Sequence, residues 1–300
     1  MTMKNTLILG DASYSSWSMR AGLLVDRFDL PVRTYFIRFG AGAIRETMAP
    51  FHPARTVPTW ITPERIAIGD SLAIAEEMAA RFPDKALWPQ DPSARAAART
   101  ITAEMHSGFM ALREHCPMNL RTAYTGVDVP DAVKEDLARI ERIWSWARDY
   151  AAAKGPWLLG SYSIADAFFA PVAMRIAGYG LDVGPDARDY VEAHLNDPAF
   201  RRWRAFGFAK DGPLERYRND YDQVAWPGPA SSLVAKSVPT GPAVNASCPF
   251  GEPGAPRTHF AEAGGQVFGF CNEVCRDQVV YDAEAWPAFM TVYKEAQEAA

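Results

Sequence analysis

The stretch Thr56-Val-Pro-Thr-Trp-Ile-Thr-Pro-Glu-Arg-Ile-Ala-Ile-Gly-Asp-Ser71 joins a proline, two short apolar runs and a helix start. Thr59–Thr62 and Arg65–Ile68 flank Pro63-Glu64, a pattern that predicts a β-hairpin. Asp and Ser in Gly69-Asp-Ser71 suit a helix start, because their side-chain oxygens cap free backbone N–H groups. This stretch therefore predicts a hairpin that leads directly into a helix.

The residues before this stretch predict a second half of the same small unit. Thr6–Leu9 is an apolar run typical of a buried strand. The Ser-rich turn Ser13–Ser18 precedes a segment from Met19 with apolar residues at helical spacing. Val32–Phe39 is rich in β-branched and aromatic residues, so it predicts a second strand. Residues 5–80 thus predict strand–helix–strand followed by strand–strand–helix.

The middle of the chain predicts helices only, over residues 93–210. Apolar residues recur at heptad-like spacing from Val133 to Ala147, flanked by charged residues. Ser163-Ile-Ala-Asp166 has the Ser-x-x-acid pattern of a helix N-cap, and the apolar residues after it predict a helix buried on all sides. One further amphipathic helix is expected from Asn196. The segment therefore predicts a helical bundle.

The last part of the chain holds three of its four cysteines. Residues 222–246 are mostly Pro, Gly, Ser and Ala, which predicts a linker. Cys248, Cys271 and Cys275 follow, and an odd number of clustered thiols is a poor disulfide framework. Thiolates at such spacing suit a soft or borderline metal ion. We therefore expect a small metal-binding module over residues 247–290.

Composition narrows the class of protein and of partner. The chain has 300 residues, enough for two domains, and 48% hydrophobic residues, as in ordinary globular proteins. Its net charge of -5 gives no reason to expect nucleic acid or an anionic membrane as a partner. We expect no membrane helix and no signal peptide, because no apolar stretch is long enough. With few cysteines, the expected location is the reducing cytoplasm.

The order and spacing of these elements resemble the cytosolic glutathione S-transferases over roughly residues 5–215. The resemblance implies an α/β thioredoxin-like, glutathione-binding domain over 1–82 and an all-α helical bundle over 90–215. It also implies a homodimer. The linker at 222–246 and a small treble-clef-like α+β metal module at 247–290 complete the expected organisation.

The resemblance assigns glutathione-binding roles within the opening stretch. In the family, a cis proline at the position of Pro58 turns the backbone of Val57 outward, where it pairs with the cysteinyl part of glutathione. Asp70 and Ser71 match the acid–Ser pair that holds the γ-glutamyl carboxylate at a helix N-terminus. The alternatives are that Pro58 only starts a strand and that Asp70 only caps a helix.

The motif that carries the chemistry is Ser15-Ser-Trp-Ser-Met-Arg20, which resembles the Ser-Ser-Cys-x-x-Arg signature of the zeta, or maleylacetoacetate isomerase, class. Aligned through Arg20, Ser15 takes the catalytic position, where a hydroxyl stabilises the glutathione thiolate. Trp17 replaces the class cysteine, which argues against isomerase chemistry. Tyr14 is the other hydroxyl within reach, and the serines could also serve only as helix caps.

Two further features belong to the helical part. Met110 and Phe109 lie on the first bundle helices, which line the second-substrate pocket in the family, and an adaptable apolar wall suits that role. His106 and Arg113 either face a substrate or make ordinary polar contacts. Cys116 is isolated in the sequence, so we expect an inert buried thiol.

Cys248-Pro-Phe-Gly251, the run ending at Cys271, and Cys275 resemble TRASH and YHS metal-binding modules. The resemblance implies zinc or another soft divalent metal. Three thiolates leave a tetrahedral ion one ligand short, and His259 is the expected fourth ligand, with Asp277 or water as alternatives.

The sequence as a whole predicts a glutathione-dependent transferase that joins the glutathione thiolate to a small electrophile and carries a zinc-type module. Two rival interpretations remain open. One is a non-catalytic protein of the same fold that binds or senses metal, and the other is a glutathione-dependent isomerase of the maleylacetoacetate isomerase type.

Overall fold

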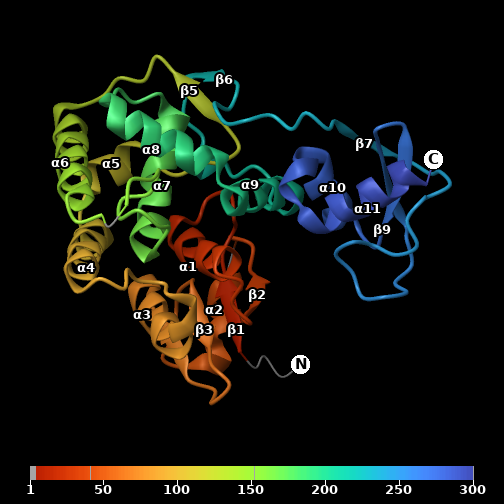
Figure 1. Cartoon of the computed structure of the whole chain (residues 1–300), viewed down its shortest axis with the longest axis horizontal. Coiled ribbons are helices and arrows are strands. Elements are labelled where there is room, and N and C mark those ends of the chain that lie inside the picture. The colour runs from red at the N-terminus through yellow and green to blue at the C-terminus, as the bar shows by residue number, and fades with distance from the viewer. Residues whose placement is uncertain (1–4, 41, 152, 300) are drawn as a thin grey trace. The chain divides into compact units, whose positions relative to one another are not determined.

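The computed structural model of the chain describes residues 5–40, 42–151 and 153–299. The chain divides into two compact units. The first unit comprises Met1–Leu195 and Leu214–Pro227, and the second unit comprises Asn196–Pro213 and Gly228–Ala300. Both units are therefore built from two separate pieces of sequence, and Figure 1 shows the longer piece of the first unit in red to green and that of the second unit in cyan to blue.

The first unit contains a four-stranded sheet of order β2-β1-β3-β4. Its strands are β1 (Thr6–Leu9), β2 (Arg33–Phe36), β3 (Thr59–Ile61) and β4 (Ala67–Gly69). β1 and β2 are parallel, whereas β3 pairs antiparallel with both β1 and β4. The hairpin predicted from the opening stretch is thus confirmed, and its Trp60 side chain is completely buried.

The helices of this α/β part are α1 (Ser16–Arg27), α2 (Ala43–Met48) and α3 (Ser71–Arg81). α1 and α3 contact each other and the central strands β1 and β3, so they cover one side of the sheet (Figure 1). The predicted strand over 32–39 is shorter than expected, and α2 was not predicted. α2 has six residues and buries only Met48, so its sequence lacks an apolar stripe.

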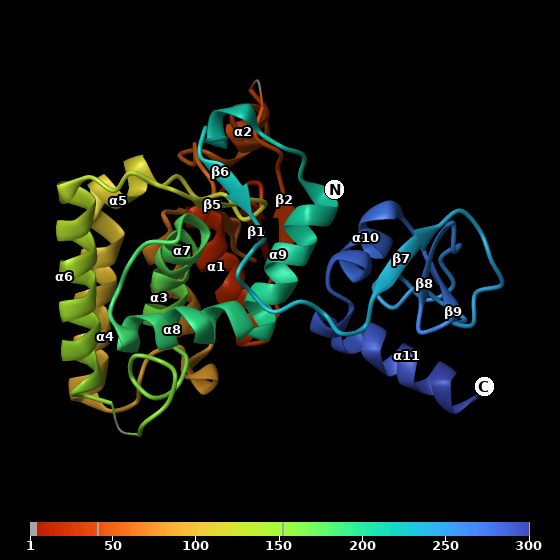
Figure 2. The same cartoon turned by 90° about the horizontal axis from the view of Figure 1, so that it is seen from above.

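The helical part of the first unit consists of α4 (Pro92–Ser107), α5 (Met110–His115), α6 (Asp131–Arg148), α7 (Ile164–Tyr179) and α8 (Pro185–Asn196). α4 contacts both α6 and α7, and Figure 2 shows α4 and α6 side by side. α7 is buried on nearly all sides, as predicted, and Ser163 and Asp166 form its capping box.

Two expectations about this half need correction. The range 90–215 is not all helical, because it includes β5 (Ala123–Thr125), which pairs with β6 (Asp222–Val224). β6 lies within the expected linker 222–246, and so does β7 (Ala235–Val238). Strands of three or four residues with exposed side chains carry too little apolar alternation to be recognised in a sequence.

The second unit is built around a three-stranded antiparallel sheet of order β7-β8-β9. Its other elements are β8 (His259–Ala263), β9 (Gln266–Phe270), α9 (Pro198–Lys210), α10 (Glu273–Tyr281) and α11 (Pro287–Glu298). Gly264 and Gly265 connect β8 to β9 with positive φ angles of 57° and 79°. Two successive residues in this region favour glycine and give a tight hairpin.

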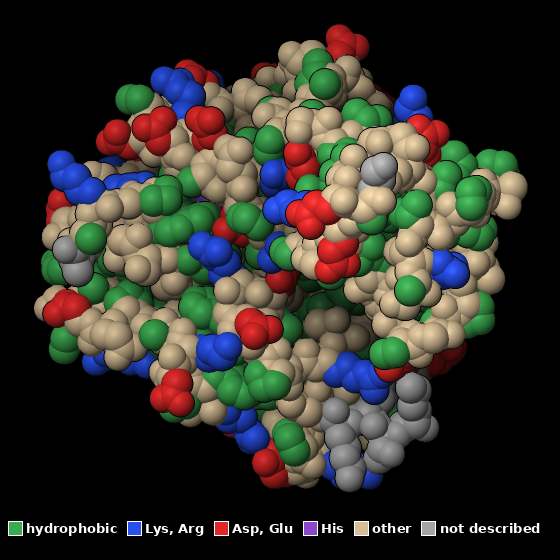
Figure 3. Space-filling model, turned by 45° about the vertical axis from the view of Figure 1, so that its right-hand side comes forward, with side chains coloured by type: hydrophobic (Ala, Val, Ile, Leu, Met, Phe, Trp, Pro, Cys, Tyr) green, Lys and Arg blue, Asp and Glu red, His purple; other side chains and the backbone are tan. Residues whose placement is uncertain are grey.

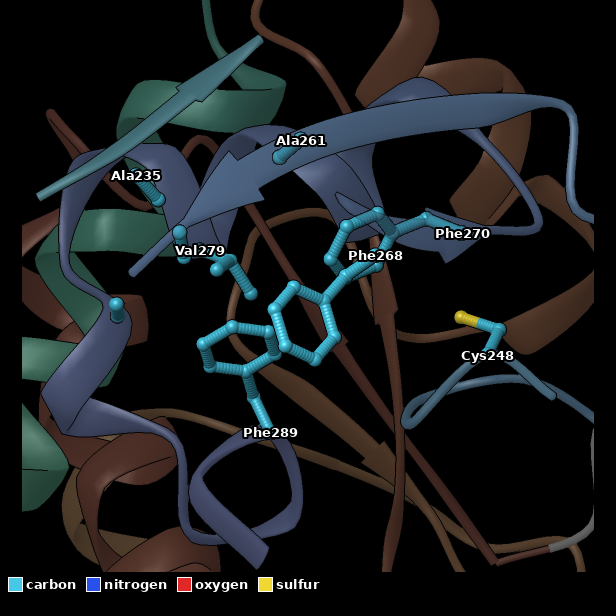
Figure 4. Packing of buried hydrophobic residues seen from close by; sticks show 9 residues of the cluster. Ala235, Cys248, Ala261, Phe268, Phe270, Val279 and Phe289 are labelled. Atoms are coloured by element: carbon cyan, nitrogen blue, oxygen red, sulfur yellow. The ribbon is translucent and has the colours of Figure 1, made fainter. Parts of the chain in front are cut away.

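Three phenylalanines form the centre of the second unit. Phe268, Phe270 and Phe289 are fully buried, and Figure 4 shows their rings together with Cys248 at the side of the cluster. The Phe268 and Phe289 ring centroids are 5.2 Å apart in an edge-to-face arrangement. The small aromatic core expected for the cysteine module is therefore present.

α9 belongs with this core, although its sequence suggested the helical bundle. It packs on α10, and the Arg201 guanidinium donates two hydrogen bonds to the Asp282 carboxylate, at 2.8 and 2.7 Å. Arg202 also donates to the backbone carbonyl of Ala285, at 3.1 Å. The second unit is consequently larger than the module expected over 247–290.

The molecular surface agrees with the composition. On the face shown in Figure 3, acidic and basic side chains are interspersed. Among the described residues, no helix combines the length and the apolar character needed to span a bilayer.

Candidate active site and candidate metal centre

The hydroxyl of Ser15 caps the N-terminus of α1. Its Oγ accepts a hydrogen bond from the Ser18 backbone N–H at 3.2 Å, and it donates to the Ser18 Oγ at 2.8 Å. The Ser18 Oγ in turn accepts the N–H of Gly10 at 2.9 Å. All three serines of the motif are buried, and Ser15 and Ser16 line a cavity. The N-terminal end of α1, with its partial positive charge, therefore faces that cavity.

Tyr14 also lines this cavity, but its hydroxyl has a structural partner. The Leu214 backbone N–H donates to the Tyr14 hydroxyl at 3.1 Å, and the Tyr14 ring stacks on Tyr217 with centroids 4.8 Å apart. Tyr14 thus connects the second piece of the first unit, Leu214–Pro227, to the start of α1.

The cavity beside Ser15 has a volume of about 790 Å³, within the range of small-molecule sites. One wall comes from the α/β part and the other from α4, α5, α7 and the segment after Leu214. Its apolar lining includes Trp17, Phe39, Ile44, Met110, Pro117 and Met118. The resemblance predicted Met110 as part of such a wall, and the structure places it there.

Cationic side chains dominate the polar part of the lining. They are Arg55, Arg113, Arg175 and Arg216, with His106 beside them, and none of the described lining residues is acidic. Two of these arginines donate to backbone carbonyls: Arg175 to Cys116 at 2.8 Å, and Arg113 to Gly108 at 2.8 Å. Burial lowers the pKa of Arg175 to about 10. Because the described lining is cationic and includes no acidic residue, the cavity favours an anion.

A fifth arginine, Arg20, is the last residue of the Ser15–Arg20 motif. It is completely buried, and its three guanidinium nitrogens have no hydrogen-bond partner among the described residues. Its guanidinium carbon lies 4.4 Å from the Trp17 ring centroid and 4.9 Å from that of Phe168, which is cation–π geometry. Burial, followed by repulsion from Arg113 and Arg175, lowers the pKa of Arg20 well below its usual value.

Asp70 and Ser71 lie at the start of α3, as predicted, but outside the lining of this cavity. One Asp70 oxygen caps the helix, accepting from Leu72 N at 2.7 Å, and the other lies 3.2 Å from His106 Nε2. Burial lowers the pKa of His106, and the nearby Asp70 carboxylate opposes this shift. The Ser71 hydroxyl is buried without a hydrogen-bond partner among the described residues.

The loop before β3 supplies the remaining predicted residues. The Val57–Pro58 peptide bond is cis, and Val57 lines the cavity opposite the start of α1. Sequence reasoning did not foresee a second cis bond, His52–Pro53, or the roles of Arg55, Arg175 and Arg216 in the cavity. Only the fold brings these arginines together.

The second unit brings the three predicted thiols together. The sulfurs of Cys248, Cys271 and Cys275 all lie within 4.8 Å of one another, and those of Cys271 and Cys275 are 3.7 Å apart. Cys248 lies between β7 and β8, Cys271 directly follows β9, and Cys275 lies in the first turn of α10. The unit therefore offers three soft ligands at one point, which fits a zinc-type ion.

The thiols perturb one another strongly. Hydrogen bonding from Cys275, and from the backbone N–H groups of Cys271 and Phe250, lowers the pKa of Cys248 to about 5. Burial raises the pKa of Cys271, and the hydrogen bond to Cys248 raises that of Cys275. Cys116, in contrast, is buried far from other thiols in the sequence, and burial raises its pKa to about 11, consistent with the expected inert thiol.

The structure does not bring the proposed fourth ligand into this group. His259 lies on β8, where its Nδ1 is 3.0 Å from the Thr258 hydroxyl, and it is not part of the group of ligand atoms formed by the thiols. The alternative, Asp277, instead pairs with Arg276 at 2.6 Å. The position of His259 on the same hairpin as Cys271 did not predict that it would join the thiols, because neighbouring residues of a strand point to opposite faces.

Comparisons with known proteins agree with the fold of the first unit. Residues 14–81 match the family "Glutathione S-transferase, N-terminal domain". A probable maleylacetoacetate isomerase from Caenorhabditis elegans is 26% identical over 178 residues, covering 58% of this chain and 79% of the relative. The maleylacetoacetate isomerase of Rattus norvegicus is 33% identical over 102 residues, covering 34% of this chain and 47% of the relative.

Solved structures show the same architecture. A glutathione transferase homologue from Burkholderia, with bound glutathione, is 25% identical with a TM-score of 0.50, covering 68% of this chain and 97% of its own. Glutathione transferase Omega 3C from Trametes versicolor is 18% identical with a TM-score of 0.51, covering 71% and 91%. Residues 14–81 are thus similar to glutathione S-transferase N-terminal domains, and the first unit has the glutathione S-transferase fold.

Proposed function

We propose that the first unit is a glutathione-dependent enzyme that generates the glutathione thiolate at Ser15 and directs it at a small anionic electrophile. The observation that carries this proposal is the cavity in which the α1 N-terminus and Ser15 meet four arginines and Val57. Similarity to glutathione transferases and maleylacetoacetate isomerases supports a glutathione-dependent reaction.

Glutathione would bind along the α/β part. The outward-turned backbone of Val57 pairs with the cysteinyl part, and the α3 N-terminus with Asp70 and Ser71 receives the γ-glutamyl group. The unpartnered Ser71 hydroxyl supports this arrangement, because a buried hydroxyl without a partner costs free energy until a ligand satisfies it. When glutathione is bound, one Asp70 carboxylate oxygen would still accept the Leu72 N–H and cap α3.

Ser15 would stabilise the thiolate as a hydrogen-bond donor. Its oxygen accepts the Ser18 N–H as a cap, so its proton can turn from the Ser18 hydroxyl to the incoming sulfur. Lowering a thiol pKa by ~2 units requires ~2.7 kcal/mol. One charge-assisted hydrogen bond and the positive end of α1 supply that amount.

In conjugation the thiol proton goes to solvent, a sulfur–carbon bond forms at the electrophile, and the leaving group departs with its electron pair. In isomerisation the same thiolate adds to a double bond and is expelled unchanged. The cationic cavity suits a carboxylate substrate in either case. The isomerase alternative is favoured by the names of the two curated relatives, while Trp17 at the position of the class cysteine favours conjugation.

Glutathione consumption separates these reactions. The purified protein is mixed with glutathione and either a haloalkyl carboxylate or a cis-alkene dicarboxylate, and free thiol and products are followed together. Conjugation consumes one thiol per product, whereas isomerisation yields the trans alkene with no thiol lost. No turnover of either substrate, with no glutathione binding, would contradict the proposal and favour a non-catalytic metal protein.

We also propose that the second unit binds zinc or another soft divalent metal through Cys248, Cys271 and Cys275. Support comes from the convergence of the three sulfurs, and their free thiol state suits the reducing cytoplasm. Metal analysis of freshly purified protein tests this: we expect about one ion per chain, lost in Cys271→Ser and retained in Cys116→Ser. Protein without stoichiometric metal would refute the site.

The fold further suggests a homodimer with two-fold symmetry. Sedimentation at micromolar protein is expected to give twice the 33.1 kDa chain mass, and a single-chain mass would contradict it.

A further inference from the structure

We propose that the metal ion held by Cys248, Cys271 and Cys275 keeps its fourth coordination position open and binds a small exogenous thiolate there. This inference rests on the metal site proposed above. It goes beyond that site, because it makes the second unit a ligand-binding centre and not only a folding element.

The donor set of the site consists of three sulfurs. Only three ligand atoms converge, and no His, Asp or Glu among the described residues joins the group. The two candidates on neighbouring elements are engaged elsewhere, His259 with the Thr258 hydroxyl and Asp277 with Arg276. Zinc in proteins takes four ligands, and sites with three protein ligands leave the fourth position to water or substrate.

The sulfurs are spaced as ligands of one ion. A zinc–sulfur bond of about 2.3 Å places two sulfurs of a tetrahedron about 3.8 Å apart. The Cys271 and Cys275 sulfurs are 3.7 Å apart, close to this edge, and all three sulfurs lie within 4.8 Å of one another. A tetrahedron with three protein corners has one corner left for another ligand.

The fourth coordination position lies on the exposed side of the three sulfurs. Cys248 is buried, whereas Cys271 and Cys275 are only half-buried. Gly251 closes one side of the group with backbone alone: a Cβ there would lie 3.0 Å from the Cys271 sulfur and 3.6 Å from the Cys248 sulfur. The remaining side, at Cys271 and Cys275, is the one that solvent reaches.

The surroundings of the sulfurs can stabilise the negative charge of the site. Three thiolates and a divalent ion leave one net negative charge, and a fourth thiolate adds another. The site can carry this charge because the Asn272 amide donates to the Cys271 sulfur at 3.4 Å. Cys275 also lies in the first turn of α10, at the positive end of the helix.

Sulfur is the favoured donor atom of the incoming ligand. An ion selected by three thiolates is soft or borderline, so a thiolate binds it more strongly than a carboxylate or water does. In the exchange, the thiol gives its proton to solvent and its sulfur replaces the bound water, with no change in oxidation state.

The test uses the full chain loaded with cobalt(II), whose thiolate charge-transfer and ligand-field bands report the donor set. The protein is prepared in a non-thiol reductant and titrated with 2-mercaptoethanol, with its S-methyl ether as the matched control. We expect a saturable gain in charge-transfer intensity with the thiol and none with the ether. Wild-type protein and His259→Ala should respond alike. A parallel titration uses glutathione, with S-methylglutathione as its control. Comparison with 2-mercaptoethanol then shows whether the site binds a bulky thiol as well as a small one.

The inference is overturned if wild-type spectra ignore the thiol while His259→Ala responds, because His259 then fills the fourth position. It is also overturned if neither protein responds, although the metal site itself would then stand. Failure to bind cobalt or zinc at all would instead remove the proposed metal site, so the two failures are distinguishable.

Discussion

At the scale of single residues, Ser15 combines two tasks that a simple substitution would confuse. Its oxygen caps α1, and its proton is the proposed donor to the thiolate. Ser15→Ala removes both, and loss of an N-cap alone costs roughly 1 kcal/mol of stability. Glycine at an N-cap costs only a few tenths of that amount, so Ser15→Gly isolates the chemical role.

Ser15→Gly should therefore lower kcat/KM with glutathione about 10²-fold, the usual effect of removing one donor to a developing anion, while the unfolding midpoint hardly moves. Steady-state kinetics and thermal unfolding measure the two effects. Full activity in Ser15→Gly, together with an inactive Ser16→Ala or Tyr14→Phe, would move the role to another hydroxyl.

The cavity arginines allow a second test at this scale. Arg216 lines the cavity and stacks over Phe39 and Tyr217, so its loss should weaken binding of a carboxylate substrate. We expect Arg216→Gln to reduce kcat/KM for an anionic electrophile about tenfold, which corresponds to about 1.4 kcal/mol, and to spare a neutral one.

Arg218→Gln is the matched control, because Arg218 pairs with Glu215 and does not line the cavity. Equal losses for charged and neutral electrophiles in Arg216→Gln would mean that the arginine shapes the cavity without recognising charge.

At the scale of elements, α8 carries a buried histidine that makes stability depend on pH. His194 packs against Trp157, Tyr162 and Tyr190, and burial lowers its pKa to about 3. In the unfolded chain the same group titrates near ~6.5. The unfolded state therefore binds more protons below that pH, so stability is fully present above about pH 6.5 and falls as the pH decreases toward 3.

Between about pH 7 and pH 5 this single group should cost about 2 kcal/mol of unfolding free energy. Denaturant unfolding of the wild type and of His194→Phe at both pH values isolates it, since the phenyl ring fits among aromatic neighbours and does not titrate. An identical loss in the variant would show that other groups cause the pH dependence.

Elements with strong local signals could be predicted from the sequence. Thr6–Leu9, the hairpin after Pro58 and the capping box at Ser163 all form as predicted, because each depends on neighbours in the chain. β5 and β6 escaped prediction, since their pairing joins Tyr124 to Gln223 across most of the helical part. Short polar strands gain their stability from such distant partners.

The candidate sites also contain residues that the sequence reveals and residues that only the fold brings together. Ser15 and Asp70 occupy helix starts, which a sequence reveals, and the three cysteines are recognisable by type and spacing. The charge of the cavity was not predictable, because Arg113 and Arg175 come from helices far apart in the chain. The fourth ligand also failed to follow from the sequence, since proximity along a hairpin does not fix the direction of a side chain.

At the scale of the whole molecule, the two units have separate cores and separate chemistry, so they should respond separately to loss of metal. A strong chelator should expose the second unit to proteolysis and leave glutathione turnover by the first unit unchanged. Limited proteolysis and activity assays on one sample measure this. Equal protection with and without chelator would contradict a structural role of the metal.

The central claim is that the first unit lowers the pKa of the glutathione thiol, and a direct measurement is the ultraviolet absorbance of the thiolate as the enzyme–glutathione complex is titrated with base. The account predicts an apparent pKa about 2 units below the ~8.5 of a free thiol, returning toward that value in Ser15→Gly. A bound thiol that titrates like free glutathione, or a protein that binds no glutathione, would contradict it.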